Sequence, residues 1–368
     1  MPKPHKSAHK RSDPGLDIHR GFAVVLMFLA HAWRVQDHYS PQGFGWLDRT
    51  LAWMDRGVAY VAASFLFIAG FSLVLAHRDA IARGRTGWLL ALLRRAGWLY
   101  VLSVLMFLPE HGAQWPDLLT SSGILSVIAV AVAVTATAMV SPQSNLVLAI
   151  ASAAVLVVTY LLERAGLPVS GLNAGPGGAI PLVMFSTLGA LCGRHYLRRG
   201  VRGLSVVCGV ALPVFAAALI HDERWLAFYT SVYSDHGGLA IADWLGMTNP
   251  GSGTVSLTFW NPSALGALGL IAPVVATTAG LLAIQRRVAG SRALWPLLML
   301  GRHALFVFVA HYGLLGLVDL SGLRPPHAGW TLVLLLALTV ASVGMSVAVE
   351  AWEKRRRRQR PSEKKNIA

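Results

Sequence analysis

Apolar residues occupy long continuous runs in this chain, and short clusters of charged residues separate one run from the next. A helix that crosses a hydrocarbon layer about 30 Å thick needs roughly 20 residues with few charges. Only helices and closed barrels span lipid, and the alternation of apolar and polar positions that a barrel strand requires is absent from the sequence. We therefore predict an all-α polytopic membrane protein with ten spans, at residues 18–37, 57–76, 88–108, 118–140, 145–162, 179–195, 203–221, 262–284, 302–320 and 328–352.

The composition excludes two other classes of protein. Of the 368 residues, 55% are hydrophobic and 13% are charged. A soluble globular domain has about a quarter of its residues charged, and a disordered chain has far fewer apolar residues than this one. The composition therefore agrees with the membrane prediction.

The positive charges predict how the spans are oriented. The chain has 32 Lys and Arg residues and 17 Asp and Glu residues, a formal net charge of +15. Such a charge in a soluble chain would suggest nucleic-acid binding, but 25 of the 32 positive residues lie in the two tails, in linkers on one side or at the start of the third span. The positive-inside rule places that side, with both termini, in the cytoplasm.

This orientation defines three parts of the chain. We predict cytoplasmic basic tails at residues 1–17 and 353–368 and a transmembrane domain at residues 18–352. A basic tail directly after a last span normally contacts lipid headgroups, so we expect membrane lipids and no nucleic acid as its partner. The sequence contains no spacing typical of metal ligands and no phosphate-binding loop, so we expect no metal site.

Ionisable side chains line one face of the first predicted span. From Arg20 to His31 is eleven positions, which is three helical turns plus about 20° and a rise of roughly 16 Å. His38, seven positions further, returns to within about 20° of the same stripe. Asp17 lies one turn before Arg20, close enough for an ion pair.

An ionisable group inside a span costs a few kcal/mol or more, so it normally marks a pathway or a site. Histidine titrates near neutrality and accepts a proton from an attacking hydroxyl or amine, and arginine captures phosphate with two donors. We expect Arg20 and His31 to face one protein-lined cavity, with a phosphorylated donor at the cytoplasmic end. The spacing alone equally allows two interior side chains that neighbouring helices satisfy.

Three further arginines lie in the same inner leaflet as Arg20. Arg94, Arg95 and Arg302 are candidates for a basic funnel around a phosphorylated donor, or else they reach out to lipid headgroups. Adjacent helical residues point about 100° apart, so Arg94 and Arg95 are not both expected to face the interior. His303 and His311 diverge by about 80° and need not serve one site; His311 is a candidate supporting residue.

Four short motifs together give the chain a resemblance to a known superfamily. They are residues 17–23 followed by His31, residues 64–73 (Ser-Phe-Leu-Phe-Ile-Ala-Gly-Phe-Ser-Leu), residues 93–95 with Leu99 and Tyr100, and residues 301–305 followed by His311. The pattern resembles the transmembrane acyltransferase superfamily. That superfamily includes the acyltransferase-3 family and the glucan succinyltransferase-like and heparan-alpha-glucosaminide acetyltransferase-like proteins.

The resemblance implies a function. Such proteins move an acyl group, often acetyl, from cytoplasmic acyl-CoA to a sugar on the other side of the membrane. It assigns His31 as the catalytic histidine and Arg20, Arg94 and Arg95 as donor-binding arginines. With the residue analysis, we expect Asp17 to orient Arg20, His38 to assist catalysis and Arg302 to join the donor site.

We therefore expect a multi-pass acyltransferase of the bacterial inner membrane that uses acyl-CoA, with acetyl-CoA as the donor substrate, and acts on an envelope glycan or glycolipid. His31 acts either as a general base or as a nucleophile that carries the acyl group. The alternative is a proton-coupled transporter or exporter of a polar lipid or sugar, in which the same stripe moves protons. The aromatic outer segment 221–261 either contacts sugar or lies in the membrane interface.

Overall fold

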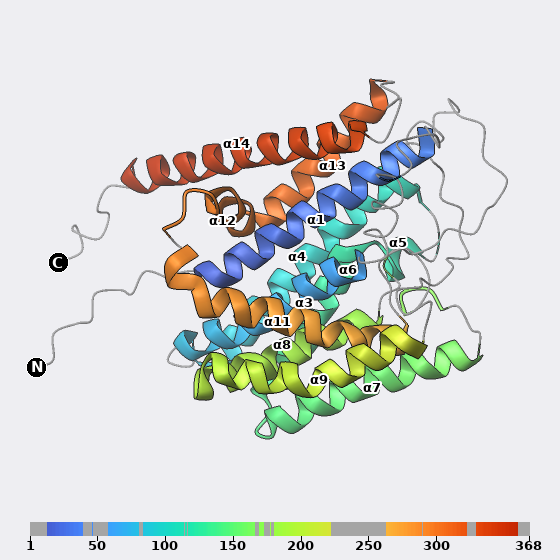
Figure 1. Cartoon of the computed structure of the whole chain (residues 1–368), viewed down its shortest axis with the longest axis vertical. Helices are drawn as coiled ribbons and strands as arrows, with labels where there is room; N and C mark the ends of the chain where they lie inside the picture. The colour runs from blue at the N-terminus through green and yellow to red at the C-terminus, as the bar shows by residue number, and fades with distance from the viewer. Residues whose placement is uncertain are drawn as a thin grey trace, which may run out of the picture. The chain divides into compact units, whose positions relative to one another are not determined.

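The computed structural model describes residues 13–39, 58–80, 84–113, 117–165, 169–172, 180–221, 263–288, 290–321 and 329–359, together with Trp46, Trp115 and Gly177. Most of these residues lie in α-helices (Figure 1). The helices are α1 (Pro14–Tyr39), α3 (Val58–Ala80), α4 (Arg85–His111), α5 (Asp117–Thr120), α6 (Ile124–Val140), α7 (Ser144–Ala165), α8 (Ile180–Arg199), α9 (Val201–His221), α11 (Ala264–Val288), α12 (Trp295–Arg302), α13 (Ala304–Leu320) and α14 (Gly329–Gln359).

The all-α membrane class is confirmed, since each predicted span contains a helix. Seven of the described helices are long and apolar enough to cross a membrane, and the bent pair α12 and α13 makes up to eight. Helix α6 is apolar but shorter, with 17 residues. The count of ten spans and the cytoplasmic position of both termini stay predictions.

The structure adds a break to one predicted span and a short helix before another, and local chain geometry explains both. The predicted span 118–140 is divided into α5 and α6, because Gly123 has a φ of 98° that interrupts the helix between them. The predicted span 302–320 is α13, and the separate helix α12 precedes it, with a bend of 92° between the two helices. The chain therefore approaches the ninth span along a short helix that periodicity did not predict.

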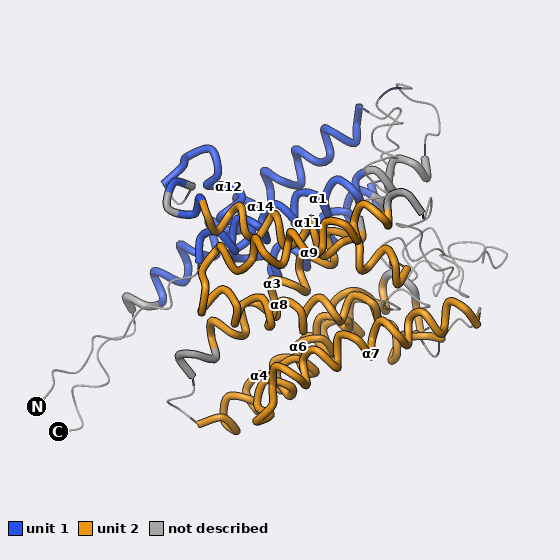
Figure 2. The backbone as a smooth tube through the Cα atoms, turned by 60° about the horizontal axis from the view of Figure 1, so that its bottom comes forward, with its two compact units in different colours: residues 1–48, 284–368 blue, residues 49–283 orange. Residues whose placement is uncertain are grey.

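The chain forms two compact units (Figure 2). Unit 1 contains residues 1–48 and 284–368, which include α1, α12, α13 and α14. Unit 2 contains residues 49–283 and therefore α3 to α9 and most of α11. The predicted division into two tails and one transmembrane domain is untested by this arrangement.

Helix α1 is the central element of unit 1. It begins at Pro14, whose fixed φ suits the first position of a helix. The preceding Asp13 caps it, since the backbone N–H of Gly15 donates to Asp13 Oδ1 over 3.1 Å. Burial raises the pKa of the Asp13 carboxyl, and the hydrogen bonds from Gly15 and Leu16 partly oppose that rise.

Two glycines let α1 and α12 cross at backbone distance. A Cβ atom on Gly21 would overlap the backbone carbonyl of Leu297, and a Cβ atom on Gly301 would overlap the carbonyl of Asp17. The two helices therefore each offer a glycine to the other at the crossing, as small residues do in membrane helix pairs. Because Gly301 lies against the backbone of α1, the next residue, Arg302, lies beside Asp17.

Unit 2 uses the same device between α3 and α8. A Cβ atom on Gly70 would overlap the carbonyl of Ser186, and one on Gly189 would overlap the carbonyl of Phe67. Around this crossing the polar groups are hydroxyls, and Thr135 and Ser186 hydrogen-bond over 2.8 Å. A buried apolar cluster of α3, α4, α6, α7 and α8 residues lies beside it, with Leu148 fully buried.

Candidate functional site

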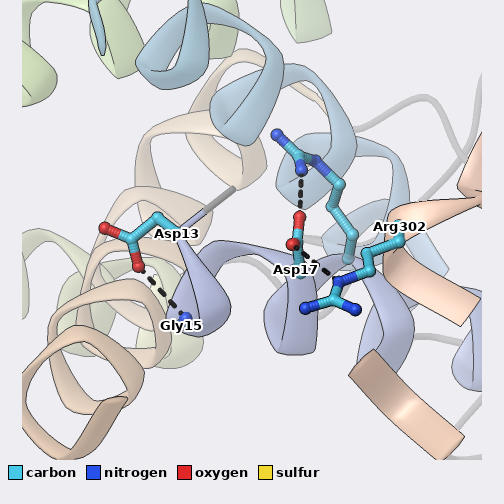
Figure 3. Close-up of polar contacts among 5 residues, drawn as sticks. Asp13, Gly15, Asp17 and Arg302 are labelled. Carbon is cyan, nitrogen blue, oxygen red and sulfur yellow. Dashed lines mark hydrogen bonds and ion pairs between the residues drawn. The ribbon is translucent and has the colours of Figure 1, made fainter. Parts of the chain in front are cut away.

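A buried carboxylate joins two arginines in unit 1. The Asp17 side chain is only 2% exposed, and its Oδ1 accepts a hydrogen bond from Arg20 Nη1 at 2.7 Å. Its Oδ2 lies 3.7 Å from Nε of Arg302, as Figure 3 shows. The ion pair predicted from the spacing of Asp17 and Arg20 is present, and α12 adds the second arginine.

The two guanidinium groups are partly exposed. The Arg20 side chain is 25% exposed and that of Arg302 is 38% exposed, in contrast to the carboxylate between them. Electrostatic interactions also join Arg20 to Asp13 and Arg302 to Glu350. Such a cluster is suited to a phosphate group, because each guanidinium can bind phosphate through two donors. We call Asp17, Arg20 and Arg302 the guanidinium cluster.

The second site on α1 is a pair of imidazole rings. His31 Nδ1 lies 2.8 Å from Nε2 of His311, a residue 280 positions away on α13. The His31 ring is partly exposed and His311 is fully buried. The pair therefore has one ring at an accessible position and one ring inside unit 1.

Aromatic side chains surround this histidine pair. Phe28, Phe308 and Tyr312 have ring centroids 5.3, 5.4 and 4.6 Å from that of His311. Tyr312 also lies 5.5 Å from His31 in an edge-to-face arrangement. The aromatic rings restrict the rotation of both imidazoles, since each contact fixes a ring plane.

Packed apolar side chains separate the guanidinium cluster from the histidine pair. Val24 and Met27 lie between Arg20 and His31 on the same face of α1, and they are 0% and 6% exposed. The described residues therefore do not form the expected cavity shared by Arg20 and His31. The reason is that α12, α13 and α14 pack on α1, so the stripe between the two sites is covered within unit 1.

The other predicted site residues are placed differently. Arg94 and Arg95 on α4 are both exposed, so neither faces the interior of unit 2. His38 belongs to the last turn of α1, but its side chain lies outside the described residues, as does nearly all of the aromatic segment 221–261. Their roles stay predictions. Among the described residues, no group of three or more His, Cys, Asp or Glu side chains gathers as a metal site would.

Sequence periodicity gives His311 only a supporting role. The 80° divergence between His303 and His311 assumes that one helix carries both residues, but α12 ends at Arg302 and the axis bends before α13. The approach of His311 to His31 depends on tertiary packing of α13 against α1, which no local pattern encodes. The resemblance motif that ends in His311 was the available signal.

The fold and the two sites define a class of protein, a multi-pass membrane protein in which α1 contributes to both an imidazole pair and a guanidinium cluster. The family of the heparan-alpha-glucosaminide N-acetyltransferase catalytic domain matches residues 13–233. The match covers more than half of the chain and includes α1 to α9. The chain therefore belongs to this family of membrane acetyltransferases.

No curated protein matches the chain significantly. The family match includes Asp17, Arg20 and His31 but ends before α12, so Arg302 and His311 follow the matched residues. The geometry of unit 1 is thus the evidence that connects those two residues to the first helix.

Proposed function

We propose that the chain is an acetyltransferase of the bacterial inner membrane that takes an acetyl group from cytoplasmic acetyl-CoA and transfers it to an envelope glycan or glycolipid. The observation that carries the proposal is the arrangement on α1, with a guanidinium cluster near its start and a histidine pair further along it. Family membership supports the acetyl group. The family name also favours an amino sugar as the acceptor, because it describes N-acetylation of a glucosaminide.

The spacing of the two sites fits the shape of the donor. Arg20 and His31 are separated by a rise of roughly 16 Å along α1. The phosphopantetheine arm of CoA has about thirteen bonds between its phosphorus and its sulfur, which is close to four residues of extended chain, or about 15 Å. A donor whose phosphates contact Arg20 and Arg302 therefore presents its thioester at the level of His31.

Charge favours this direction of binding. The donor phosphates are anionic, and Arg20 and Arg302 place two partly exposed guanidinium groups on either side of Asp17. Hydrogen bonds between guanidinium and phosphate are charge-assisted and geometrically specific. Asp17 acts here as a positioning residue that holds both arginines for the phosphates.

At the other end, His31 removes the acceptor's proton. The acceptor nitrogen forms a bond to the thioester carbonyl carbon, its proton passes to the His31 imidazole, and the carbon–sulfur bond then breaks. The proton returns from the imidazolium to the departing CoA thiolate. In the alternative order, His31 first attacks the thioester, carries the acetyl group and is released by the acceptor.

Binding of the donor requires a local change in unit 1. Val24 and Met27 are buried along the face that the pantetheine arm must follow. We propose that the arm replaces the side chains that cover these two residues, which moves part of the α12–α13 segment away from α1. The bend of 92° at His303 provides a break at which such a movement is local.

The experiment uses the full chain in sealed vesicles that contain glucosamine as the acceptor probe, with radiolabelled acetyl-CoA outside. Proteolysis of the two tails reports which orientation each chain has. The expected result is N-acetylglucosamine inside the vesicles and free CoA outside, only for chains with their termini outward. Passage of unmodified glucosamine without acetylation would instead support the transporter alternative and contradict the proposal.

A second measurement separates the two chemical routes. Rapid quenching with acetyl-CoA in the absence of acceptor, followed by mass spectrometry of the peptide that contains His31, detects an acetyl-imidazole. An acetylated His31 peptide supports the nucleophilic route. Its absence at times when a turnover with acceptor is complete supports direct transfer.

A further inference from the structure

The two imidazole rings of the histidine pair meet edge to edge. Their planes differ by 15° and their centroids lie 5.0 Å apart, while His31 Nδ1 and His311 Nε2 are separated by 2.8 Å. A centroid distance so much longer than the nitrogen contact shows that the rings lie side by side in nearly one plane. The contact is therefore an in-plane hydrogen bond directed along the nitrogen lone pair.

This hydrogen bond requires one proton between the two nitrogens, and either ring can supply it. If His31 carries the proton on Nδ1, its lone pair is on Nε2, and that nitrogen is basic. If instead His311 donates its Nε2 proton, Nδ1 of His31 must accept it. Neutral His31 then carries its own proton on Nε2, so this nitrogen has no lone pair with which to act as a base. The direction of one hydrogen bond thus decides whether His31 can act.

The proposed role of His31 selects the first arrangement. A general base and a nucleophile both need a lone pair on the ring nitrogen that does not contact His311. Nδ1 of His31 must then donate the shared proton, and Nε2 of His311 is the acceptor. Nδ1 of His311 makes no hydrogen bond among the described residues, so no other hydrogen bond of this ring opposes that tautomer.

We infer that His311 is the positioning residue of the acetyl-transfer site: it accepts the Nδ1 proton of His31 and thereby holds the reactive lone pair on His31 Nε2. The inference rests on the proposed function and holds for both chemical routes, because a general base and a nucleophile each need that lone pair. A third group that orients a catalytic histidine in this way is normally a carboxylate or a carbonyl. Here a buried neutral imidazole takes that place.

Burial suits His311 to this task. It is fully buried and enclosed by Phe28, Phe308 and Tyr312, so water does not compete for its Nε2. When His31 gains a proton during transfer, the imidazolium keeps its Nδ1 hydrogen bond to His311, which becomes charge-assisted and stronger. No proton has to move to His311 in either route.

The test compares two substitutions of the same residue in the full chain. His311→Phe keeps an aromatic ring in the aromatic enclosure but removes the acceptor, and His311→Gln offers an amide oxygen as a substitute acceptor. His195→Gln, a histidine substitution in unit 2 outside the site, is the matched control. The assay measures kcat and KM for acetyl-CoA with glucosamine as the acceptor, and thermal unfolding in detergent reports folding.

The expected result is a loss of kcat of about 100-fold or more in His311→Phe, because the wrong tautomer of a catalytic histidine is severely impaired. KM should stay within about threefold, and His311→Gln should recover at least about tenfold of the lost kcat. The acid limb of the kcat/KM profile should move to lower pH in His311→Phe, because the imidazolium of His31 loses its acceptor. Equal losses in the Phe and Gln variants, or an unchanged pH profile, would overturn the inference.

The failure of this inference and the failure of the proposed function are distinguishable. An active His31→Ala variant removes the proposed role of His31 itself. An inactive His31→Ala variant with fully active His311→Phe leaves the proposed function in place and rejects only the positioning role. Unfolding of His311→Phe at a lower temperature does not affect the result, because the Gln and pH comparisons use only the folded, active fraction.

Discussion

Each unit of this protein has a close helix crossing at a pair of glycines, and among the described residues an ion pair lies beside the crossing of unit 1, whereas hydroxyl groups lie beside that of unit 2. In unit 1, Gly21 and Gly301 bring α1 against α12, and in unit 2, Gly70 and Gly189 bring α3 against α8. The crossing in unit 1 positions a buried carboxylate and two arginines. Close helix crossings are therefore a means of assembly in both units, and the side chains beside the glycines decide what each crossing does.

Unit 2 shows what a purely structural polar group looks like in this fold. Its buried polar groups near the crossing are hydroxyls that bond to each other or to backbone carbonyls, such as Thr135 with Ser186 and Ser152 with Thr187. These contacts are neutral and leave no charge in the membrane interior. The contrast favours a functional reading of the ionisable groups on α1, which cost more to bury.

Among substitutions that compare unit 1 with unit 2, His31→Ala is expected to change kcat the most. Loss of the proton acceptor should lower kcat by about 10²- to 10⁴-fold, while a histidine substitution in unit 2, His195→Ala, should leave kcat unchanged. The measurement is the release of CoA thiol with glucosamine as acceptor. Comparable activity of His31→Ala and His195→Ala would remove the functional distinction between the units.

The second effect concerns the guanidinium cluster. Arg20→Gln and Arg302→Gln should each raise KM for acetyl-CoA by about 10- to 100-fold with a small change in kcat, because each removes a charge-assisted phosphate contact. The matched control in unit 2 is Arg194→Gln, whose native side chain donates to Ser144 and Asn145 over 2.6 Å. A change in kcat with constant KM would place these arginines in the chemical step instead.

The glycine crossings give a third and more direct comparison. Gly301→Ala and Gly189→Ala should each destabilise the fold by about 1–3 kcal/mol, because the added methyl overlaps a backbone carbonyl of the partner helix. Only Gly301→Ala should also raise KM for acetyl-CoA, since it displaces Arg302 from Asp17. Thermal unfolding and steady-state kinetics of both variants test this, and an equal KM in both would contradict it.

The smallest effect is expected at the start of α1. Asp13→Ala removes the cap of the helix and should cost about 1 kcal/mol of stability. Asp13 interacts with Arg20 more weakly than it interacts with the backbone of Gly15 and Leu16, so KM and kcat should change much less than in the arginine variants. A loss of activity larger than the loss of folded protein would show that Asp13 contributes to the donor site.

Local spacing predicted the parts of the site that belong to one helix. Asp17 and Arg20 are three positions apart, so their ion pair follows from helical geometry alone. The all-α class followed equally from the lengths of the apolar runs. In both cases the prediction depended on neighbours in sequence and on the known geometry of a helix.

The parts that depend on tertiary packing were not predictable from pattern. Arg302 reaches Asp17 only because the eight-residue helix α12 forms and the chain bends after it. His311 reaches His31 across 280 positions. The exposure of both Arg94 and Arg95 likewise depends on which face of α4 the rest of unit 2 covers, and adjacent positions gave no preference.

The packed side chains of Val24 and Met27 have a consequence for the energetics of the cell. If the proposed function is correct, the arginines serve one compartment and the imidazole serves the other, and water filling the distance between them would dissipate an ion gradient. The packed segment of α1 then limits such a leak while no donor is bound. The proposal implies that the acetyl-CoA arm fills the same space during turnover, so that the substrate itself maintains the insulation of the membrane.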